Sequence, residues 1–354
     1  MPPEGARDGA PSGGAPGSAA PAGGVDALAD AVLQGDKRAV ARALNLVEDR
    51  RPSARDDVAA LLERLAASDT DGGHRVGMTG PPGVGKSSLC AALGRTLREA
   101  GRSVGVVAID PSSVRSGGSL LGDRARMSFD PGDEGFFVRS LATGGQAGGL
   151  SYAANSAARV LGAAFDVVLI ETTGVGQSET DVMHLADTVA LVIQPGSGDA
   201  LQFLKAGIME IPDVLIVNKA DQVALARRAV SDLRGALRAA KSAGLVDAGA
   251  AWEVPIVPTS AETGRGLDSL AHQLALHHAY LLAAPGGVRA RRLRGDVEWT
   301  LSLFAHTYGA HGVSTLGGRA NLRLEVRQSL EAGETALRLV DTLGQRYLDA
   351  LRTA

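Results

Sequence analysis

The sequence predicts an α/β protein in which a mostly parallel β-sheet is flanked by helices on both faces. Seven short apolar runs alternate with helical segments over about 200 residues, and such alternation builds parallel sheets. The runs are apolar at successive positions, as strands covered on both faces must be. Polar motifs follow several runs, at the strand ends where ligands bind in these sheets. The expected strands are 75–78, 104–109, 136–138, 167–170, 189–193, 214–217 and 256–258.

The regions on either side of the sheet are expected to be helical. Residues 25–72 are predicted to form an N-terminal extension of two helices, separated at Pro52-Ser53, and 73–284 to form the sheet domain. The Pro-, Gly-, Ala- and Ser-rich segment 1–24 predicts a disordered tail. Residues 288–354 form a C-terminal helical region too short for a large core of its own, so we expect it to pack on the main domain or on a second copy.

The composition excludes several classes of protein. With 36 basic and 39 acidic residues, the charge is nearly balanced, so composition does not indicate binding to nucleic acid or to an anionic membrane. Its single cysteine, Cys90, excludes an internal disulfide framework and a cysteine-based zinc site, and is expected to be a small buried residue. No run of 18 apolar residues and no secretory signal is found, so we expect a cytoplasmic protein without a membrane span.

A phosphate-binding loop is predicted between the first expected strand and the helix after it. The chain there matches G-x-x-x-x-G-K-[ST], whose glycines let main-chain N–H groups approach phosphates at the positive end of a helix. Lys86 is expected to reach the β- and γ-phosphates, and the Ser87 hydroxyl to ligate Mg²⁺. A chance glycine-rich loop would not explain the order of strand, loop and helix. The predicted loop residues are Gly80, Pro81, Pro82, Gly83, Val84, Gly85, Lys86, Ser87 and Ser88.

A guanine-binding motif is predicted at the end of the sixth expected strand. The motif is Asn218-Lys219-Ala220-Asp221. A carboxylate at Asp221 accepts hydrogen bonds from N1–H and the 2-amino group of guanine, a pair of donors that adenine lacks. The Asn218 side chain is expected to brace the loops, and the Lys219 stem to cover the ring. Ser260, Ala261 and Glu262 suit a second base-binding loop, although Ser-Ala alone is only a turn signal.

Three acids are expected near the magnesium site: Asp110, Asp123 and Glu171. Mg²⁺ takes few carboxylates and keeps several waters, so Ser87 and one carboxylate are expected to bind it directly and the other acids through water. Which acid binds directly is left open. The alternative for each acid is a helix cap, an exposed strand-end charge or an ordinary loop acid.

The segment after Glu171 is expected to sense the γ-phosphate. The Gly174 amide suits a bond to the terminal phosphate, and Gln177 either orients water or is an ordinary loop side chain. Arg124 and Arg126 are candidates for an arginine that acts in cis, and His184 is interpreted as structural.

Together these motifs resemble the MeaB-type GTPases. The segments that carry the resemblance are 77–87, 108–113, 117–123, 171–179 and 195–199, and the similarity extends over about 25–285. Members of this family, which have a SIMIBI-like P-loop NTPase fold, are chaperones of adenosylcobalamin-dependent acyl-CoA mutases such as methylmalonyl-CoA mutase. The chain departs from the family at Thr173, where valine is usual, and within 123–127 and 139–145.

The resemblance implies a homodimer with a C-terminal dimerisation arm, binding GTP or GDP with Mg²⁺. It implies GTP hydrolysis that gates cofactor loading and protects or reactivates the mutase. Because the sequence shows no clear arginine finger, we expect hydrolysis to be slow in the free chain and to be stimulated by the mutase. The resemblance assigns the three acids to the magnesium and switch positions, and Asp199 and Lys205 to a switch that signals to the partner. From the residues alone, the preferred interpretation of Asp199 is a solvated helix start, and that of Lys205 is an ordinary surface lysine.

Other functions are compatible with parts of the pattern. A nickel metallochaperone GTPase should carry Cys/His clusters, which one cysteine and seven scattered histidines do not supply. A kinase or ATPase coupled to transport conflicts with the guanine motif, and an interaction module with a vestigial site conflicts with the complete residue set. The sequence does not distinguish methylmalonyl-, isobutyryl-, ethylmalonyl- and hydroxyisobutyryl-CoA mutases as partners.

Overall fold

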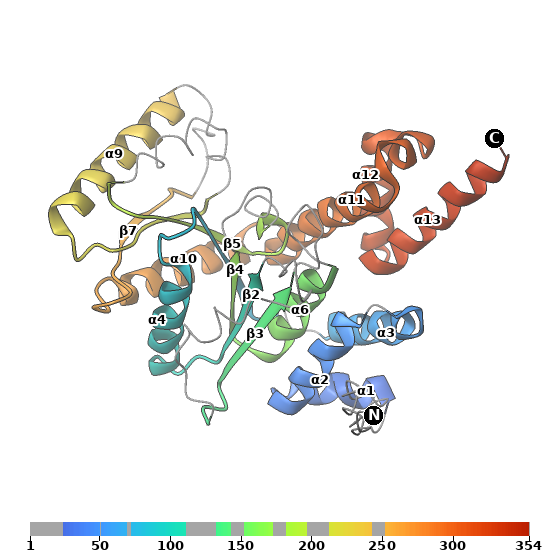
Figure 1. The fold of residues 1–354 in the computed structure, drawn as a ribbon, viewed down its shortest axis with the longest axis horizontal. Helices are drawn as coiled ribbons and strands as arrows, with labels where there is room; N and C mark the ends of the chain where they lie inside the picture. The colour runs from blue at the N-terminus through green and yellow to red at the C-terminus, as the bar shows by residue number, and fades with distance from the viewer. Residues whose placement is uncertain are drawn as a thin grey trace, which may run out of the picture.

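The described part of the protein is built on one seven-stranded sheet in which every neighbouring pair is parallel (Figure 1). The computed structural model describes residues 24–49, 51–68, 72–110, 132–142, 152–172, 182–196, 212–242 and 252–353. The strands are β1 (His74–Thr79), β2 (Val104–Asp110), β3 (Phe136–Ala142), β4 (Val167–Thr172), β5 (Thr188–Ile193), β6 (Val214–Val217) and β7 (Ile256–Pro258). All seven expected strands are present, and the predicted fold class is confirmed.

The strand order, β3-β2-β4-β1-β5-β6-β7, decides which loops meet. Because all strands are parallel, their carboxyl ends lie along one edge of the sheet. β4 and β5 are the two neighbours of β1, so the loop that follows β1 lies between the ends of these strands. β6 and β7 follow outward from β5 on the same side.

Helices cover both faces of the sheet because its strands are apolar on both sides. All six positions of β4 are buried. Val168 and Ile170 pack in a cluster with α6 (Tyr152–Ala164), whereas Val167 and Leu169 pack in the cluster of α4 (Lys86–Glu99) and α10 (Leu267–Ala283). This alternation is the period-two geometry of a strand, and it separates the core into two layers.

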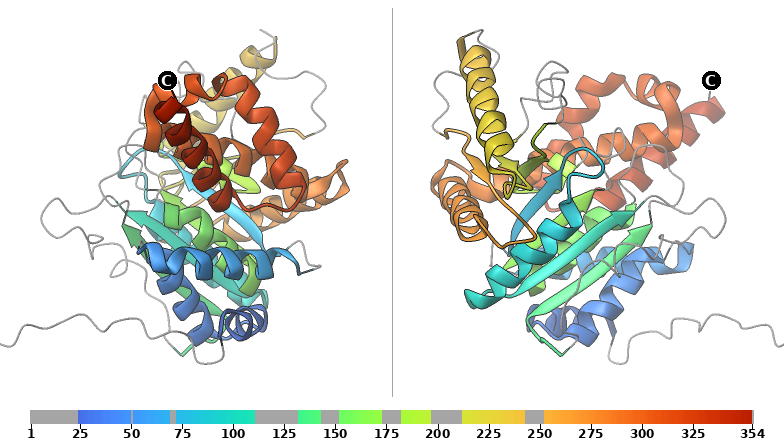
Figure 2. Two further views of the ribbon diagram at one scale, coloured as in Figure 1. Left: turned by 90° about the vertical axis from the view of Figure 1, so that its right-hand side faces the viewer. Right: turned by 60° about the vertical axis from the view of Figure 1, so that its left-hand side comes forward.

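The edge formed by β6 and β7 is covered by a further helix, α9 (Val223–Ser242). Its buried residues, Ala226 and Leu233, pack with Leu191 of β5 and Leu215 of β6 in a separate cluster. Figure 2 (right) shows α9, in yellow, on the opposite side of the molecule from the C-terminal helices, in red.

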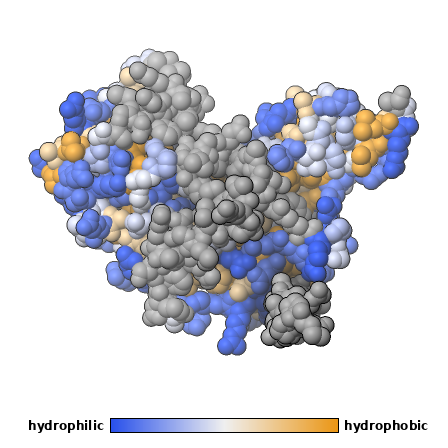
Figure 3. All heavy atoms as spheres, in the orientation of Figure 1, coloured by the Kyte–Doolittle hydropathy of each residue, from blue (hydrophilic) through white to orange (hydrophobic). Residues whose placement is uncertain are grey.

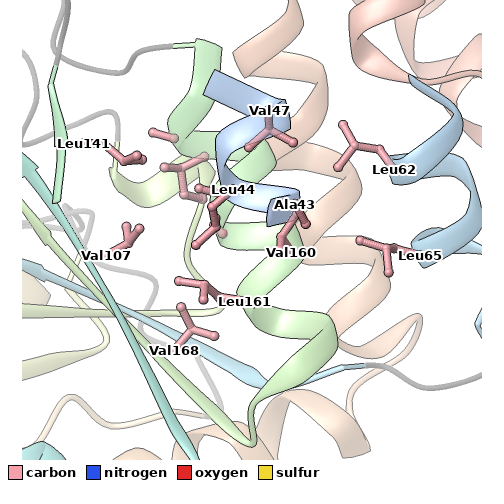
Figure 4. Close-up of a cluster of buried hydrophobic side chains, with 14 of the residues drawn as sticks. Ala43, Leu44, Val47, Leu62, Leu65, Val107, Leu141, Val160, Leu161 and Val168 are labelled. Atoms are coloured by element: carbon pink, nitrogen blue, oxygen red, sulfur yellow. The ribbon is translucent and has the colours of Figure 1, made fainter. Parts of the chain in front are cut away.

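The N-terminal helices pack on α6 (Figure 4), so they lie on the face of the sheet opposite α4. They are α1 (Gly24–Leu33), α2 (Lys37–Glu48), the short 3-10 helix η1 (Pro52–Ala54) and α3 (Arg55–Ala66). The prediction of two helices in this region is wrong, because Gly35 ends the first helix in the left-handed conformation, with a φ of 76°. Asp36 then caps α2 by accepting a 2.8 Å hydrogen bond from the Ala39 amide.

The C-terminal helices have a small core of their own, in addition to contacts with the main domain. They are α11 (Gly287–Thr315), α12 (Gly318–Glu331) and α13 (Ala336–Thr353). Phe304 and Leu301 of α11 pack with Val326 of α12 and Leu343 of α13, and α11 contains a kink at Gly309. Trp299 and Leu337 instead join the cluster of the N-terminal helices and α6. The sequence predicted that the C-terminal helices pack on the main domain or on a second copy. It did not predict the core that these helices form among themselves.

No described helix is both long enough and apolar enough to cross a bilayer.

A buried polar network lies at the amino-terminal edge of the sheet, opposite the strand ends that carry the motifs. His74 at the start of β1 lies 2.6 Å from the Thr188 hydroxyl, which lies 2.7 Å from Nδ1 of His277. His277 Nε2 lies 3.3 Å from an oxygen of Asp213. With neutral rings, each imidazole N–H or hydroxyl donates along this chain toward the carboxylate, which can only accept.

Two adjacent arginines tie α11 to this edge. Arg291 forms an ion pair with Asp213 at 2.5 Å, and Arg292 forms one with Asp187 at 2.6 Å. Burial alone would raise the pKa of Asp187, but the hydrogen bonds and charge of Arg292 lower it below its ordinary value. Asp187 and Asp213 directly precede β5 and β6, so these pairs attach the C-terminal helices to the sheet.

The buried His74 should make stability depend on pH. Burial, together with the neighbouring His278, lowers its pKa from 6.5 to about 3, although Asp187 opposes the shift. As pH falls, the unfolded chain therefore binds this proton before the folded chain does. The stabilisation is complete above pH 6.5 and is lost progressively down to about pH 3.

We expect His74 to add up to about 1.4 kcal/mol per pH unit to the loss of unfolding free energy below pH 6.5. Urea unfolding at pH 7.5, 6 and 5 should show a shallower pH dependence for His74→Gln. The exposed His272 provides the control, because His272→Gln should keep the wild-type slope. Identical slopes for wild type and His74→Gln would contradict the prediction.

Gly295 of α11 should tolerate no side chain. A Cβ added there would lie 2.2 Å from the carbonyl oxygen of His184, in the short 3-10 helix η2 (Val182–His184). Because a backbone atom blocks the position, Gly295→Ala should destabilise the protein by about 1–3 kcal/mol.

Gly235 in the middle of α9 is the matched control for Gly295→Ala. A Cβ added there meets nothing within 4 Å. Gly235→Ala should therefore stabilise the protein by about 0.5–1 kcal/mol, through helix propensity alone. Thermal unfolding should show a lower melting temperature for Gly295→Ala and a higher one for Gly235→Ala than for the wild type. A stabilised Gly295→Ala would contradict this packing.

Candidate nucleotide-binding site

The loop after β1 has a backbone that requires glycine at several positions. Gly80 has a φ of 136°, and a Cβ there would lie 2.1 Å from the carbonyl oxygen of Val192 on β5. Gly85 has a φ of 90°, and a Cβ there would lie 2.8 Å from Nδ2 of Asn218. The loop is thus pressed against the ends of β5 and β6, which leaves its amide groups at the start of α4.

The ammonium group of Lys86 lies within the loop. Lys86 is the first residue of α4 and is 6% exposed, and its Nζ donates to the carbonyl oxygens of Gly80 at 2.6 Å and Pro81 at 3.0 Å. Pro82, Gly83 and Ser88 are exposed along the same segment. The positive charge is therefore concentrated where the amides of a phosphate-binding loop converge.

Ser87 and Glu171 meet because β1 and β4 are neighbours. The Ser87 hydroxyl donates to Oε1 of Glu171 at 2.5 Å, and Glu171 is 5% exposed at the end of β4. A hydroxyl and a carboxylate are hard oxygen donors, which are the ligands that Mg²⁺ takes in phosphate-binding sites. The described residues at this point therefore fit Mg²⁺.

Asn218 joins the phosphate loop to the loop after β7. Its Nδ2 donates to the carbonyl oxygen of Val84 at 2.9 Å, and its Oδ1 accepts from the amide of Ala261 at 3.3 Å. It is 2% exposed, so both halves of the amide are used within the protein. This residue holds three strand-end loops in a fixed relation.

Lys219 adopts a left-handed conformation, with a φ of 58°, that directs its side chain across the loops. Its Nζ donates to the carbonyl oxygen of Gly83 at 2.9 Å and to Oε1 of Gln194 at 2.7 Å. Gln194 was not predicted as a site residue. It follows β5 directly, so its position at a strand end was a signal available in the sequence.

Asp221 is exposed, and its position is set by the loop after β7. Oδ1 of Asp221 accepts a 2.8 Å hydrogen bond from the Ser260 hydroxyl. The buried Thr259, the first residue of this loop, accepts at its carbonyl oxygen from the Ala220 amide at 2.9 Å. Glu262 is exposed beside this loop. One oxygen of Asp221 is thus oriented by the protein, and the carboxylate faces solvent.

Several predicted residues cannot be placed in this geometry. Asp110 ends β2 in register with Ala142, and only its backbone is described. The tail 1–23, residues 143–145 of the segment 139–145 and these single residues lie outside the described part of the chain: Asp123, Arg124, Arg126, Thr173, Gly174, Gln177, Asp199 and Lys205.

Two residues interpreted as structural are described. His184 lies in η2, against α11, and burial lowers its pKa. Cys90 is fully buried on α4, as expected for a small apolar residue, and burial raises the pKa of its thiol.

A family model described as methylmalonyl Co-A mutase-associated GTPase MeaB matches residues 40–312. The chain belongs to the MeaB family of GTPases. This MeaB-family chain is 43% identical to a probable GTPase of Mycobacterium bovis, over 79% of its own length and 82% of that protein. It is 32% identical to the mouse protein named methylmalonic aciduria type A homolog, mitochondrial, over 90% of its length and 78% of that protein.

A solved structure shows that the likeness extends to the fold over most of the chain. The crystal structure titled LAO/AO transport system kinase superposes with a TM-score of 0.60 at 27% identity, covering 91% of this chain and 97% of the other. Family membership and the phosphate loop together identify this MeaB-family chain as a P-loop GTPase.

Proposed function

We propose that this GTPase is a chaperone of an adenosylcobalamin-dependent acyl-CoA mutase, methylmalonyl-CoA mutase or a close relative. GTP binding and hydrolysis in the cytoplasm gate the loading of adenosylcobalamin and protect or reactivate the mutase. The observation that carries the proposal is the match to the mutase-associated family over 40–312. The bracing of the phosphate loop by Asn218, from the guanine motif, supports a site that responds to the whole nucleotide.

The residues of the chain act by positioning and charge neutralisation. The amides of the phosphate loop and the Lys86 ammonium hold the β- and γ-phosphates, and Asp221 accepts from the edge of guanine. Lys219 and Asn218 keep the base loop in register with the phosphate loop. No covalent intermediate is needed, because phosphoryl transfer depends on orientation and electrostatic stabilisation.

Ser87 is proposed to hold Mg²⁺ with an acid from Asp110, Asp123 and Glu171, the remaining acids acting through water. Of these acids, Glu171 has the support of its 2.5 Å hydrogen bond with Ser87. When bound, Mg²⁺ neutralises charge on the β- and γ-phosphate oxygens. Gly174 and Gln177 are proposed as the γ-phosphate sensor.

Signalling and assembly complete the proposal. Asp199 and Lys205 are proposed to transmit the nucleotide state to the mutase. Two copies are proposed to associate through the C-terminal helices, where Leu324 is 63% exposed and Leu348 and Leu351 are 42% and 46% exposed. Figure 3 shows an apolar patch near the end of α13. Exposed leucines of this kind favour a protein interface.

Hydrolysis assays test the proposal. The chain alone should hydrolyse GTP slowly and ATP hardly at all, and the rate with GTP should rise at least about ten-fold with adenosylcobalamin-dependent methylmalonyl-CoA mutase from the same organism. Equal GTP turnover with and without each candidate acyl-CoA mutase would reject the chaperone function. Equal hydrolysis of ATP and GTP would reject the assignment of the guanine motif.

A further inference from the structure

The helix α9 carries a concentration of positive charge that the nucleotide site does not use. Five of its residues are basic and one is acidic, on a chain with a net charge of −3. Four exposed cations follow one another at helical spacing: Arg227, Arg234, Arg238 and Lys241. At about 100° per residue they fall within roughly 60° of one another and extend over about 21 Å of the helix. We call these four residues the α9 cation stripe.

The stripe has no partner among the described residues. The carboxylate of α9 itself, Asp232, lies 4.0 Å from Arg228 on another side of the helix, and no other described acid forms an ion pair with the stripe. The residues that attach α9 to the sheet, Ala226 and Leu233, lie about 100° away around the helix. The stripe therefore faces solvent beside the packed face.

The surface next to the stripe consists of small residues. Ala224, Ser231, Gly235 and Ser242 are exposed and lie within about 40° of one another. Gly235 is in the middle of the helix, where glycine is unfavourable, and a Cβ there would meet nothing within 4 Å. Packing among the residues that the structure describes therefore gives no reason for glycine, whereas a partner helix approaching closely would give one.

We propose that the α9 cation stripe and its small-residue face bind an acidic, helical surface of the partner mutase. Charge complementarity identifies the partner surface as acidic. An exposed apolar residue at the start of the stripe, Val223, which is 39% exposed, favours a protein over a nucleic acid backbone. This inference rests on the proposed chaperone function and assigns the docking surface that function needs.

Docking on α9 would also affect the proposed guanine site, because the helix starts next to Asp221. The Val223 amide donates to the carbonyl oxygen of Asp221 at 2.9 Å, so α9 begins within two residues of the carboxylate that is proposed to bind the base. A partner that shifts the start of α9 therefore changes the position of Asp221. The mutase should alter the rate of GDP release through this helix.

Binding of the full chain to methylmalonyl-CoA mutase holoenzyme from the same organism tests the inference. Arg234→Glu combined with Arg238→Glu should weaken binding at least ten-fold at 0.05 M salt, and the difference should shrink at 0.5 M salt. Gly235→Gln keeps the charge but blocks close approach, and should also weaken binding at least three-fold. The GTP turnover of each variant without the mutase should stay at the wild-type value.

A charge-matched control separates the stripe from total charge. Arg42→Glu combined with Arg294→Glu reverses two exposed arginines on α2 and α11, and should bind the mutase within two-fold of wild type. Wild-type binding by the Arg234/Arg238 variant would overturn the inference and leave the chaperone function standing. Failure of the wild-type chain to bind the mutase at either salt concentration would overturn both. Loss of affinity for a 20-nucleotide RNA, with mutase binding retained, would assign the stripe to nucleic acid and overturn the inference.

Discussion

Asp221→Ala should lower the affinity for GTP and GDP about 100-fold or more while leaving the affinity for ATP within about two-fold. The carboxylate is expected to accept two hydrogen bonds from the guanine edge, and charge-assisted bonds of this kind contribute about 1.5–3 kcal/mol each. A loss of about 2.7 kcal/mol corresponds to 100-fold in affinity. Adenine cannot donate this pair of bonds, so its nucleotides lose nothing.

Calorimetry with GTP, GDP and ATP in the presence of Mg²⁺ measures this change. Ser260→Ala should have a smaller effect, about five- to ten-fold, because it removes only the 2.8 Å bond that orients one oxygen of Asp221. Asp268→Ala, which removes an exposed carboxylate from the first turn of α10, is the charge-matched control and should bind GTP normally. An equal loss of GTP and ATP affinity in Asp221→Ala would show that the carboxylate does not recognise the base.

Lys86→Met should lower GTP turnover by about 100- to 1,000-fold with the fold retained. Removing one preorganised charge that stabilises the transition state costs about 2.7–4 kcal/mol. Methionine preserves the apolar stem of this buried side chain, and loses the two hydrogen bonds to the carbonyl oxygens of Gly80 and Pro81.

Single-turnover hydrolysis at saturating GTP isolates the chemical step in this variant. Lys241→Met removes an exposed ammonium group from α9 and, without the mutase, should hydrolyse GTP at the wild-type rate. Thermal unfolding establishes whether Lys86→Met is folded. A folded Lys86→Met that retained more than about one tenth of the wild-type rate would remove Lys86 from the proposed mechanism.

Local patterns predicted the sheet well because the signal for each strand lies in contiguous residues. The runs 167–170 and 189–193 are apolar throughout, and β4 and β5 are buried at every position. The break between α1 and α2 was missed because the apolar spacing of Leu28, Val32 and Val40 continues through it. Gly35 and Asp36 are a helix-stop and a helix-cap signal at that point, and the local backbone followed them rather than the longer pattern.

The sequence by itself determined the class of the fold, and it predicted the residues proposed for the phosphate and guanine motifs, because each motif is a short run at the end of an apolar strand. Only the tertiary structure decided which of these residues touch. The order β4-β1-β5-β6 brings Ser87 to Glu171 across 84 positions of the chain, and Asn218 to Val84 across 134.

Only the tertiary structure also revealed the features that no sequence motif predicts, such as the buried histidine network and the exposed cation stripe of α9. Burial and exposure depend on what packs against a side chain. That is a property of the arrangement of the elements, and the spacing of residues within one element does not contain it.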